Sequence, residues 1–269
     1  MEFGIMQGRL LPNFKSQYQA HPVGNWQKEF KLAKENNLKY IEFIVDSYFY
    51  GFNPILNEDG IKEIQQLSSD TGIRVKSICA DIFMQWALKK MDINEINIYG
   101  SLLEKLICNL ARLGGSDIVI PFVDNSSLRN KDEKLFVSSF LSDFENICGK
   151  FDINLSLETD LEPKEFLTFL LSIKNKKVKV NYDSGNSASL GYDFSEEIKL
   201  FGEKISNIHI KDRKFKGGPV LLGHGDAELK KVKEFILSKK YNGITVFQAF
   251  RDSNPIKTFK KQFDYFLEL

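Results

Sequence analysis

The chain has few cysteines and histidines, three of each among its 269 residues. Cys79, Cys108 and Cys148 are odd in number and widely spaced, which indicates reduced thiols rather than a disulfide framework. No apolar run approaches the ~18 residues that span a bilayer. The first residues also lack a basic region followed by an apolar stretch, so we expect no secretory signal. These absences together predict a cytoplasmic protein without a membrane partner.

An excess of charge of either sign is also missing. The net charge is +1, which gives no reason to expect nucleic acid or an anionic membrane as a partner. Hydrophobic residues make up 42% of the chain and charged residues 27%, as in an ordinary soluble globule. No linker or low-complexity segment divides the sequence. We therefore predict a single domain over residues 1–269.

What the sequence does contain is a regular alternation of strand-like and helix-like stretches. The strand-like stretches are residues 2–6, 40–44, 74–79, 117–121, 155–160, 178–183, 205–213 and 244–249. Helical stretches between and after them include residues 26–36, 59–71, 95–113, 136–150 and 255–267. Such alternation predicts a parallel sheet that is buried on both faces. Eight units fit either a closed barrel or an open doubly wound sheet.

Two observations favour the barrel. No Gly-x-Gly-x-x-Gly follows the first strand, so a dinucleotide site of the Rossmann kind is not indicated. Most of the strands end in a polar side chain, whereas a doubly wound sheet would place its site at one switch point. Barrel enzymes carry their active-site residues at the C-terminal ends of the strands. We predict the α/β class and a (β/α)8 TIM barrel.

Three of the polar strand ends carry metal-type ligands. Glu158, Asp183 and His209 each stand at or near the end of a successive strand, 25 and 26 residues apart. A divalent cation takes such ligands, and a parallel barrel brings successive strand ends together. A single acidic residue at such a position is more often a helix cap or a solvated group. Their joint occurrence therefore carries the prediction of a metal site.

Earlier strands also end in, or contain, polar side chains. Gln7 and Arg9 follow the first strand, Glu42 lies within the second, and Asp81 follows the third. A barrel interior filled only for packing would carry Val, Ile and Leu at such positions. Because burying an unpaired charge is costly, we expect these groups to pair with one another, with a metal or with a substrate.

These motifs together resemble the xylose isomerase-like barrels. That family includes sugar and sugar-phosphate isomerases and epimerases, inosose dehydratases and type IV abasic-site endonucleases. The resemblance covers all eight units and rests on residues 4–12, 77–81, 156–160, 181–186, 209–213 and 222–226.

The resemblance implies a divalent metal, which is Mn, Mg, Co or Zn. The family's epimerases hold it with Glu, Asp, His and Glu from the fifth to the eighth strands, and Glu158, Asp183 and His209 match the first three. The fourth position is Gln248, a departure, because an amide can coordinate through its carbonyl oxygen but cannot accept a proton. Asn186 is a second departure, since some members carry a sugar-binding histidine there.

A reaction follows from the resemblance. Glu158 is the natural general base beside a metal-polarised carbonyl, and Lys211 is the expected second proton donor, with Asp81 and Glu42 as alternatives. The residues expected to bind substrate are Gln7, Arg9, Glu42, Asp81, Asn186, Arg213 and Arg251. The basic loop at 213–218 leaves a sugar phosphate open as substrate beside an unphosphorylated sugar, unless it is simply a solvated loop.

The predicted function is a metal-dependent sugar or sugar-phosphate isomerase or epimerase. The alternative is a dehydratase of a keto-polyol such as an inosose, because elimination does not need bases on both faces of a carbon. A sugar-binding barrel without activity and an abasic-site endonuclease rank below these. Three histidines and a net charge near zero disfavour the endonuclease. The sequence leaves the oligomeric state open, a homo-oligomer included.

Overall fold

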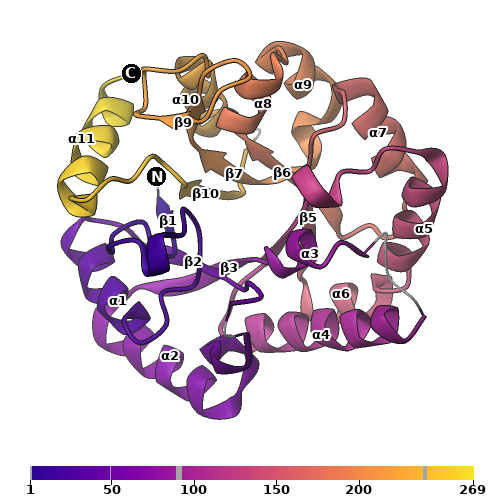
Figure 1. The fold of residues 1–269 in the computed structure, drawn as a ribbon, viewed down its shortest axis with the longest axis horizontal. Coiled ribbons are helices and arrows are strands. Elements are labelled where there is room, and N and C mark those ends of the chain that lie inside the picture. The colour runs from indigo at the N-terminus through magenta and orange to yellow at the C-terminus, as the bar shows by residue number, and fades with distance from the viewer. Residues whose placement is uncertain (1, 49, 89–92, 239–240) are drawn as a thin grey trace.

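The computed structural model describes residues 2–48, 50–88, 93–238 and 241–269, and its centre is a closed barrel of parallel strands (Figure 1). The strand order around the barrel is β1-β10-β7-β6-β5-β4-β3-β2. The strands are β1 (Gly4–Met6), β2 (Tyr40–Ile44), β3 (Arg74–Cys79), β4 (Asp117–Phe122), β5 (Asn154–Thr159), β6 (Val178–Asp183), β7 (Ile205–Ile210) and β10 (Ile244–Phe247). The predicted (β/α)8 TIM barrel is confirmed.

Helices lie around the outside of the barrel, apart from α3, which lies over the end of the barrel (Figure 1). They are α1 (Trp26–Glu35), α2 (Glu58–Thr71), α3 (Ile82–Gln85), α4 (Ile93–Arg112), α5 (Lys131–Ser142), α6 (Glu145–Phe151), α7 (Pro163–Ser172), α8 (Ser184–Leu190), α9 (Phe194–Phe201), α10 (Leu229–Leu237) and α11 (Pro255–Glu268). In the described part of the chain, none of these helices is long and apolar enough to cross a membrane.

Two expected elements differ from the structure. The helix expected at 136–150 is two helices, α5 and α6, and the chain turns between them so that the rings of Phe140 and Phe144 pack with centroids 5.1 Å apart. The strand expected at 205–213 ends at Ile210. The residues beyond it form a short antiparallel hairpin, in which β8 (Asp212–Arg213) pairs with β9 (Pro219–Val220).

The main core lies between the strands and the surrounding helices. Phe247 of β10 is fully buried and forms edge-to-face contacts with Phe3, Phe259 and Phe266 at centroid distances of 5.4–5.8 Å. Aromatic burial of this kind supplies much of the apolar contact that closes α11 against the barrel. The C-terminal helix therefore joins the last strand to the first segment of the chain.

The inside of the barrel is only partly apolar. A small inner cluster consists of Met6, Tyr40, Ile44, Cys79, Val119, Ile244 and Val246. Beside it, Glu42 accepts hydrogen bonds from Ser77 Oγ and Asn207 Nδ2, both at 2.7 Å. Alternate residues of a strand share one face, so the positions that carry this network continue toward the strand ends. A column of polar side chains therefore runs inside the barrel toward the C-terminal ends of the strands.

Local signals set the ends of α2. Asn57 is its N-cap, and the side chain accepts a 2.8 Å hydrogen bond from the backbone N–H of Gly60. Gly72 ends the helix in the left-handed conformation at φ 75°, as expected for a C-cap glycine. Asn25 precedes α1, but its side chain makes no capping bond and instead accepts from Lys28 Nζ at 2.8 Å.

This difference between two asparagines is testable. We expect Asn57→Ala to lower the free energy of unfolding by about 1 kcal/mol, because the backbone N–H of Gly60 at the start of α2 loses its acceptor. The matched change Asn25→Ala should cost less than half of that, since no capping bond is lost. Urea denaturation of both variants checks the prediction, and equal losses would contradict it.

Candidate functional site

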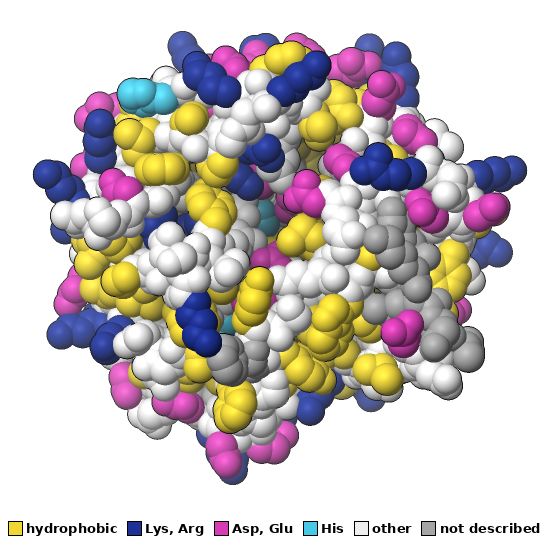
Figure 2. Space-filling view, viewed as in Figure 1, with side chains coloured by type: hydrophobic (Ala, Val, Ile, Leu, Met, Phe, Trp, Pro, Cys, Tyr) yellow, Lys and Arg dark blue, Asp and Glu magenta, His cyan; other side chains and the backbone are white. Residues whose placement is uncertain are grey.

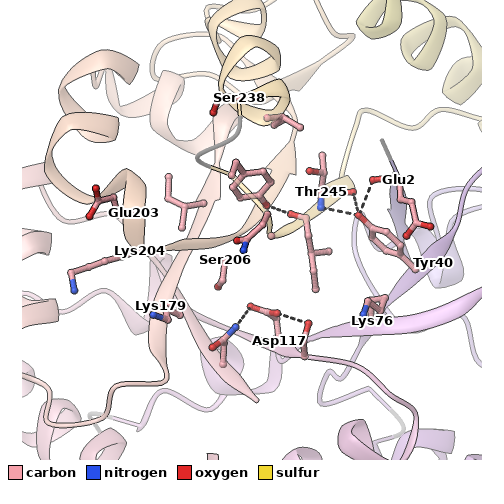
Figure 3. Close-up of a pocket in the computed structure, with 18 of the residues that line it drawn as sticks. Glu2, Tyr40, Lys76, Asp117, Lys179, Glu203, Lys204, Ser206, Ser238 and Thr245 are labelled. Atoms are coloured by element: carbon pink, nitrogen blue, oxygen red, sulfur yellow. Dashed lines mark hydrogen bonds between the residues drawn. The ribbon is translucent and has the colours of Figure 1, made fainter. Parts of the chain in front are cut away.

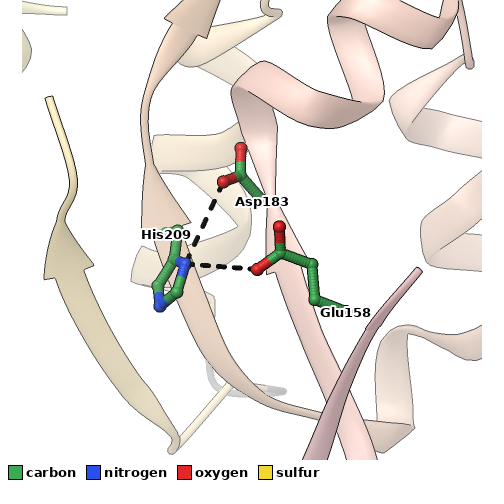
Figure 4. A group of neighbouring side chains, drawn as sticks. All are labelled: Glu158, Asp183 and His209. Atoms are coloured by element: carbon green, nitrogen blue, oxygen red, sulfur yellow. Dashed lines mark ion pairs between the residues drawn. The ribbon is translucent and has the colours of Figure 1, made fainter. Parts of the chain in front are cut away.

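The three predicted metal ligands lie together at the ends of neighbouring strands (Figure 4). Glu158 is on β5, Asp183 ends β6, and His209 on β7 stands opposite Asp183 in the strand register. One ligand atom from each lies within 4.8 Å of the other two. Nδ1 of His209 is 3.6 Å from Glu158 Oε2 and 4.0 Å from Asp183 Oδ2. The structure therefore brings together a buried Glu/Asp/His group.

Glu42 sets the orientation of the histidine. Its Oε1 lies 2.7 Å from Nε2 of His209, and both side chains are completely buried. With Nε2 directed at this carboxylate, the opposite nitrogen, Nδ1, faces Glu158 and Asp183. A carboxylate behind a histidine is the usual arrangement that fixes the tautomer and orientation of a metal-binding imidazole. Glu42 is thus a positioning residue beneath the Glu/Asp/His group.

The electrostatics of this group favour a positive charge at its centre. Burial alone would lower the pKa of His209, but the carboxylates of Glu42, Glu158 and Asp183 outweigh it and raise the pKa to about 9. Burial, together with repulsion from Asp183, raises the pKa of Glu158 to about 7. Three buried carboxylates around one ring are costly unless a cation compensates them. The donor set therefore fits a divalent cation.

Gln248 offers a further oxygen from the end of β10. Its Nε2 donates to Gln19 Oε1 at 2.8 Å, whereas its own Oε1 is buried and finds no hydrogen-bond partner among the described residues. A buried acceptor without a donor is unfavourable. This amide oxygen is consequently free for a ligand.

A cavity of about 310 Å³ opens above the group. Figure 2 shows the corresponding hollow at the centre of this face, with acidic, basic and histidine side chains in its depth. Its volume is at the small end of the range for ligand pockets and suits a small polar molecule. Predicted site residues that line it are Asp81, Glu158, Asn186, Lys211, Arg213 and Gln248.

Asn186 connects the predicted base with two cations. Its Nδ2 donates to Glu158 Oε1, and its Oδ1 accepts from Lys211 Nζ at 3.3 Å and from Arg213 Nη1 at 2.8 Å. Lys211 Nζ also lies 3.3 Å from Asp183 Oδ2. The backbone N–H of Asn186 donates to Asp183 Oδ1, which caps α8. These contacts hold Lys211 and Glu158 on one wall of the cavity.

Four residues predicted to bind substrate lie outside the cavity lining, namely Gln7, Arg9, Glu42 and Arg251. Residues 8–21 are here called the first loop. Arg251 donates to backbone carbonyl groups of this loop, all of them between residues 8 and 18. Arg9 donates to Tyr18 O at 3.1 Å and to Gln19 Oε1 at 2.8 Å. These arginines shape the first loop instead of facing the cavity.

Gln19 is a cavity residue that the sequence pattern does not indicate. Its Nε2 donates to Asp81 Oδ2 at 2.7 Å, and its Oε1 accepts from both Gln248 Nε2 and Arg9 Nη2. It stands in an irregular loop far from any strand end, so no periodicity marks it. Asp81 is buried, and this burial raises its pKa. Gln19 thus links the first loop to Asp81 and Gln248 in the cavity lining.

A buried carboxylate anchors the first loop from below. Glu29 on α1 accepts the backbone N–H groups of Gly8 at 2.6 Å and Leu10 at 3.0 Å. Gly8 has φ 83°, a conformation that glycine adopts without strain. Burial raises the pKa of Glu29 to about 7 despite these two hydrogen bonds.

Comparison with known proteins agrees with this architecture. The family model of the xylose isomerase-like TIM barrel matches residues 30–269, so the chain belongs to that family. No curated protein sequence matches the chain significantly.

Solved structures share the whole fold at low sequence identity. The 3-keto-D-glucoside 4-epimerase YcjR from E. coli, in its apo form, has a TM-score of 0.75 and 16% identity over 100% of both chains. The IOLI protein with a binding zinc atom has a TM-score of 0.77 and 15% identity, covering 100% of this chain and 98% of that chain. The probable 3-DHS dehydratase AsbF from Bacillus anthracis has a TM-score of 0.72 and 14% identity over 99% of both chains. At these identities the likeness establishes the fold.

The anchor at Glu29 makes folding stability depend on pH. Its pKa is about 7 in the folded chain and 4.5 in its ordinary state. Between these values the unfolded chain has lost the proton while the folded chain keeps it. The stabilisation by protonated Glu29 is therefore present below pH 4.5 and is lost as the pH rises through about 7. This loss lowers the free energy of unfolding by about 3 kcal/mol.

We expect the stability difference between the parent protein and Glu29→Gln to shrink by about that amount from pH 4 to pH 8. Denaturant unfolding at each pH measures it. The exposed Glu35→Gln on the same helix is the control for a surface position. A constant difference for Glu29→Gln would contradict the assignment.

Proposed function

We propose that the chain is a divalent-metal-dependent isomerase or epimerase of a small sugar or sugar phosphate. The observation that carries the proposal is the buried Glu158, Asp183 and His209 group beneath a cavity of about 310 Å³. Membership of the family supports it, as do fold neighbours named as epimerases. The three cysteines are free thiols, in keeping with the cytoplasmic location that we predict.

We propose that Glu158, Asp183 and His209 hold Mn, Mg, Co or Zn, and that Gln248 completes the set through Oε1. Two carboxylates and a neutral imidazole would leave a divalent site near neutral, whereas a fourth carboxylate would make it anionic. The bound ion would polarise a substrate carbonyl and so acidify the adjacent C–H. The unpartnered amide oxygen of Gln248 supports its place in the set.

In the proposed reaction Glu158 acts as the general base. It removes the proton from the carbon next to the carbonyl, and the electron pair of that C–H bond forms the enediolate. Returning this proton to the former carbonyl carbon, while the hydroxyl proton moves to the former carbonyl oxygen, completes an isomerisation. An epimerisation needs a proton donor on the opposite face of the same carbon. Lys211 shares one cavity wall with Glu158, so for that reaction we propose Asp81, the alternative donor.

Substrate recognition falls to the polar groups of the cavity wall. We propose that Asp81, Asn186 and Arg213 contact sugar hydroxyls or a phosphate, with Gln19 beside them. Arg213 is held by Gly217 O at 2.9 Å and by Asn186 Oδ1, so the β8–β9 hairpin presents it in a fixed position. This fixed position favours recognition of a particular substrate group.

A dehydratase is the second candidate, and Gln248 is the observation that favours it. Loss of water needs one base, because Glu158 takes the proton from the α-carbon and the hydroxyl of the β-carbon leaves as water after protonation by Lys211. An amide at the end of β10 removes the second carboxylate that epimerisation on both faces would use. The fold neighbour AsbF is named a probable dehydratase, which is compatible with this chemistry.

One experiment separates the two reactions. The Mn-loaded protein is incubated with a panel of ketoses, ketose phosphates and inososes in deuterated water and followed by NMR and ultraviolet absorbance. Deuterium at the carbon next to the carbonyl without loss of water indicates an isomerase or epimerase, and an absorbing unsaturated ketone indicates a dehydratase. We expect Glu158→Gln to lower kcat by about 10²–10⁴-fold.

Glu162→Gln, exposed after β5, is the matched control and should leave kcat unchanged. If no member of the panel exchanges or loses water with any of the four metals, the catalytic proposal fails.

Metal binding should release protons in a pH-dependent number. Without metal the pKa of Glu158 is about 7 and that of His209 about 9, and both groups must lose their protons to coordinate. We expect roughly two protons released per ion at pH 6 and roughly one at pH 8, with affinity rising as the pH rises. Calorimetric titration with Zn²⁺ in buffers of different ionisation enthalpy counts them.

Two variants sharpen this measurement. Glu42→Gln removes the carboxylate behind His209, so proton release at pH 8 should fall and affinity should drop about 10–100-fold. Asp117→Asn removes another buried carboxylate of the barrel interior and should change neither quantity. Binding without proton release, or equal effects of the two variants, would contradict the proposed ligand set.

A further inference from the structure

A second and larger cleft opens at the other end of the barrel, where the strands begin (Figure 3). Its volume is about 740 Å³. Its walls come from the first residues of β3, β5, β6, β7 and β10 and from the end of α10. The Glu/Asp/His group lies at the opposite end, so this cleft is separate from the candidate active site.

Four positive side chains line this cleft, namely Arg74, Lys76, Lys179 and Lys204, together with three acidic ones. Arg74 pairs with Glu2. Within the described ranges, Lys76, Lys179 and Lys204 form no ion pair. Figure 3 shows Lys76 and Lys179 on either side of Asp117. Lys76 and Lys179 thus flank the carboxyl group of Asp117 in the middle of the cleft without forming an ion pair with it.

Lys179 is the least expected of these groups. It is the second residue of β6, and it shares a strand face with Asn181 and Asp183, both of which point into the barrel. Burial, and then the nearby charges of Lys204 and Lys177, lower its pKa. A lysine on a solvated surface would avoid both effects. A partly buried, inward-facing lysine without an ion pair calls for an anion.

The acidic groups of the cleft do not neutralise the lysines. Asp117 is 2% exposed, and its carboxyl group already accepts from Ser116 Oγ and Ser156 Oγ at 2.8 Å and from Asn154 Nδ2 at 3.3 Å. Burial also raises its pKa, which favours the neutral form. Glu2 and Glu203 supply the other negative charges. Among the lining residues that the structure describes, the charges sum to one positive with Asp117 ionised and to two with Asp117 protonated.

We propose that this cleft binds the phosphate group of a small phosphorylated molecule. Lys76 and Lys179 supply the charge, since lysine ammonium groups are regular phosphate partners, and Ser206 Oγ lies on the same wall. The volume leaves room for an organic portion beside the phosphate. Because the cleft opens away from the strand ends, its occupant is an effector or stabilising ligand and not the substrate.

The test uses inorganic phosphate and pyrophosphate with the full chain, free of added metal, in calorimetric titrations at low ionic strength. We expect one phosphate in this cleft, bound more weakly as NaCl increases. Lys179→Gln and Lys76→Gln should each weaken binding about tenfold or more, because each removes a charge-assisted contact. Lys131→Gln, an exposed lysine that begins α5, is the matched control and should bind as the parent does.

Two further variants keep the test decisive. Lys179→Arg keeps the charge and should retain binding even if Lys179→Gln folds poorly, which thermal unfolding would reveal. Arg213→Gln removes a positive charge from the cavity at the strand ends, and the phosphate binding that Lys179→Gln weakens should persist in this variant.

Three outcomes would overturn the proposal. They are no phosphate binding, equal weakening by Lys131→Gln, and loss of binding in Arg213→Gln with retention in Lys179→Gln. The outcome does not depend on whether the proposed isomerase reaction is found, because no turnover is measured.

Discussion

The contact between Glu42 and His209 is the interaction on which the candidate active site depends. The two groups come from β2 and β7, which are not neighbours in the barrel, and they meet in its interior with no exposed surface. Neither would be stable there alone, because a buried charge needs a partner. Their pairing turns Nδ1 of the imidazole toward Glu158 and Asp183 and so defines where a cation would sit.

Groups that never face the cavity determine its shape. Glu29 accepts two backbone N–H groups of the first loop, and Arg251 donates to carbonyls of the same loop. Between them they hold Gln19 against Asp81 and Gln248. The two ends of the barrel therefore differ, because the Glu158, Asp183 and His209 group lies at the strand ends and Lys76 and Lys179 lie at the strand starts.

Much of the fold and the centre of the site follow from local patterns. The alternation of strands and helices predicts the barrel, and the period of two within strands predicts that Glu158, Asp183 and His209 converge. The partners of a side chain are harder to predict than the strand face on which it lies. Glu42 and Arg251 have residue types that suit sugar binding. In the structure, however, Glu42 contacts the imidazole of His209, and Arg251 donates to backbone carbonyl groups. A side chain's partner depends on the distance to groups remote in sequence.

The alternating pattern predicts the order of the barrel strands, the Glu, Asp and His side chains at three strand ends, and Gln248 after the last strand. The contact of Gln248 with Gln19, 229 residues away, and the position of Lys179 at the start of a strand without an ion pair to any described residue, emerge only once the barrel has closed. The physical reason is that periodicity records which face a residue occupies. Side-chain hydrogen bonds and charge balance depend on which remote groups share that space, and no local pattern encodes this.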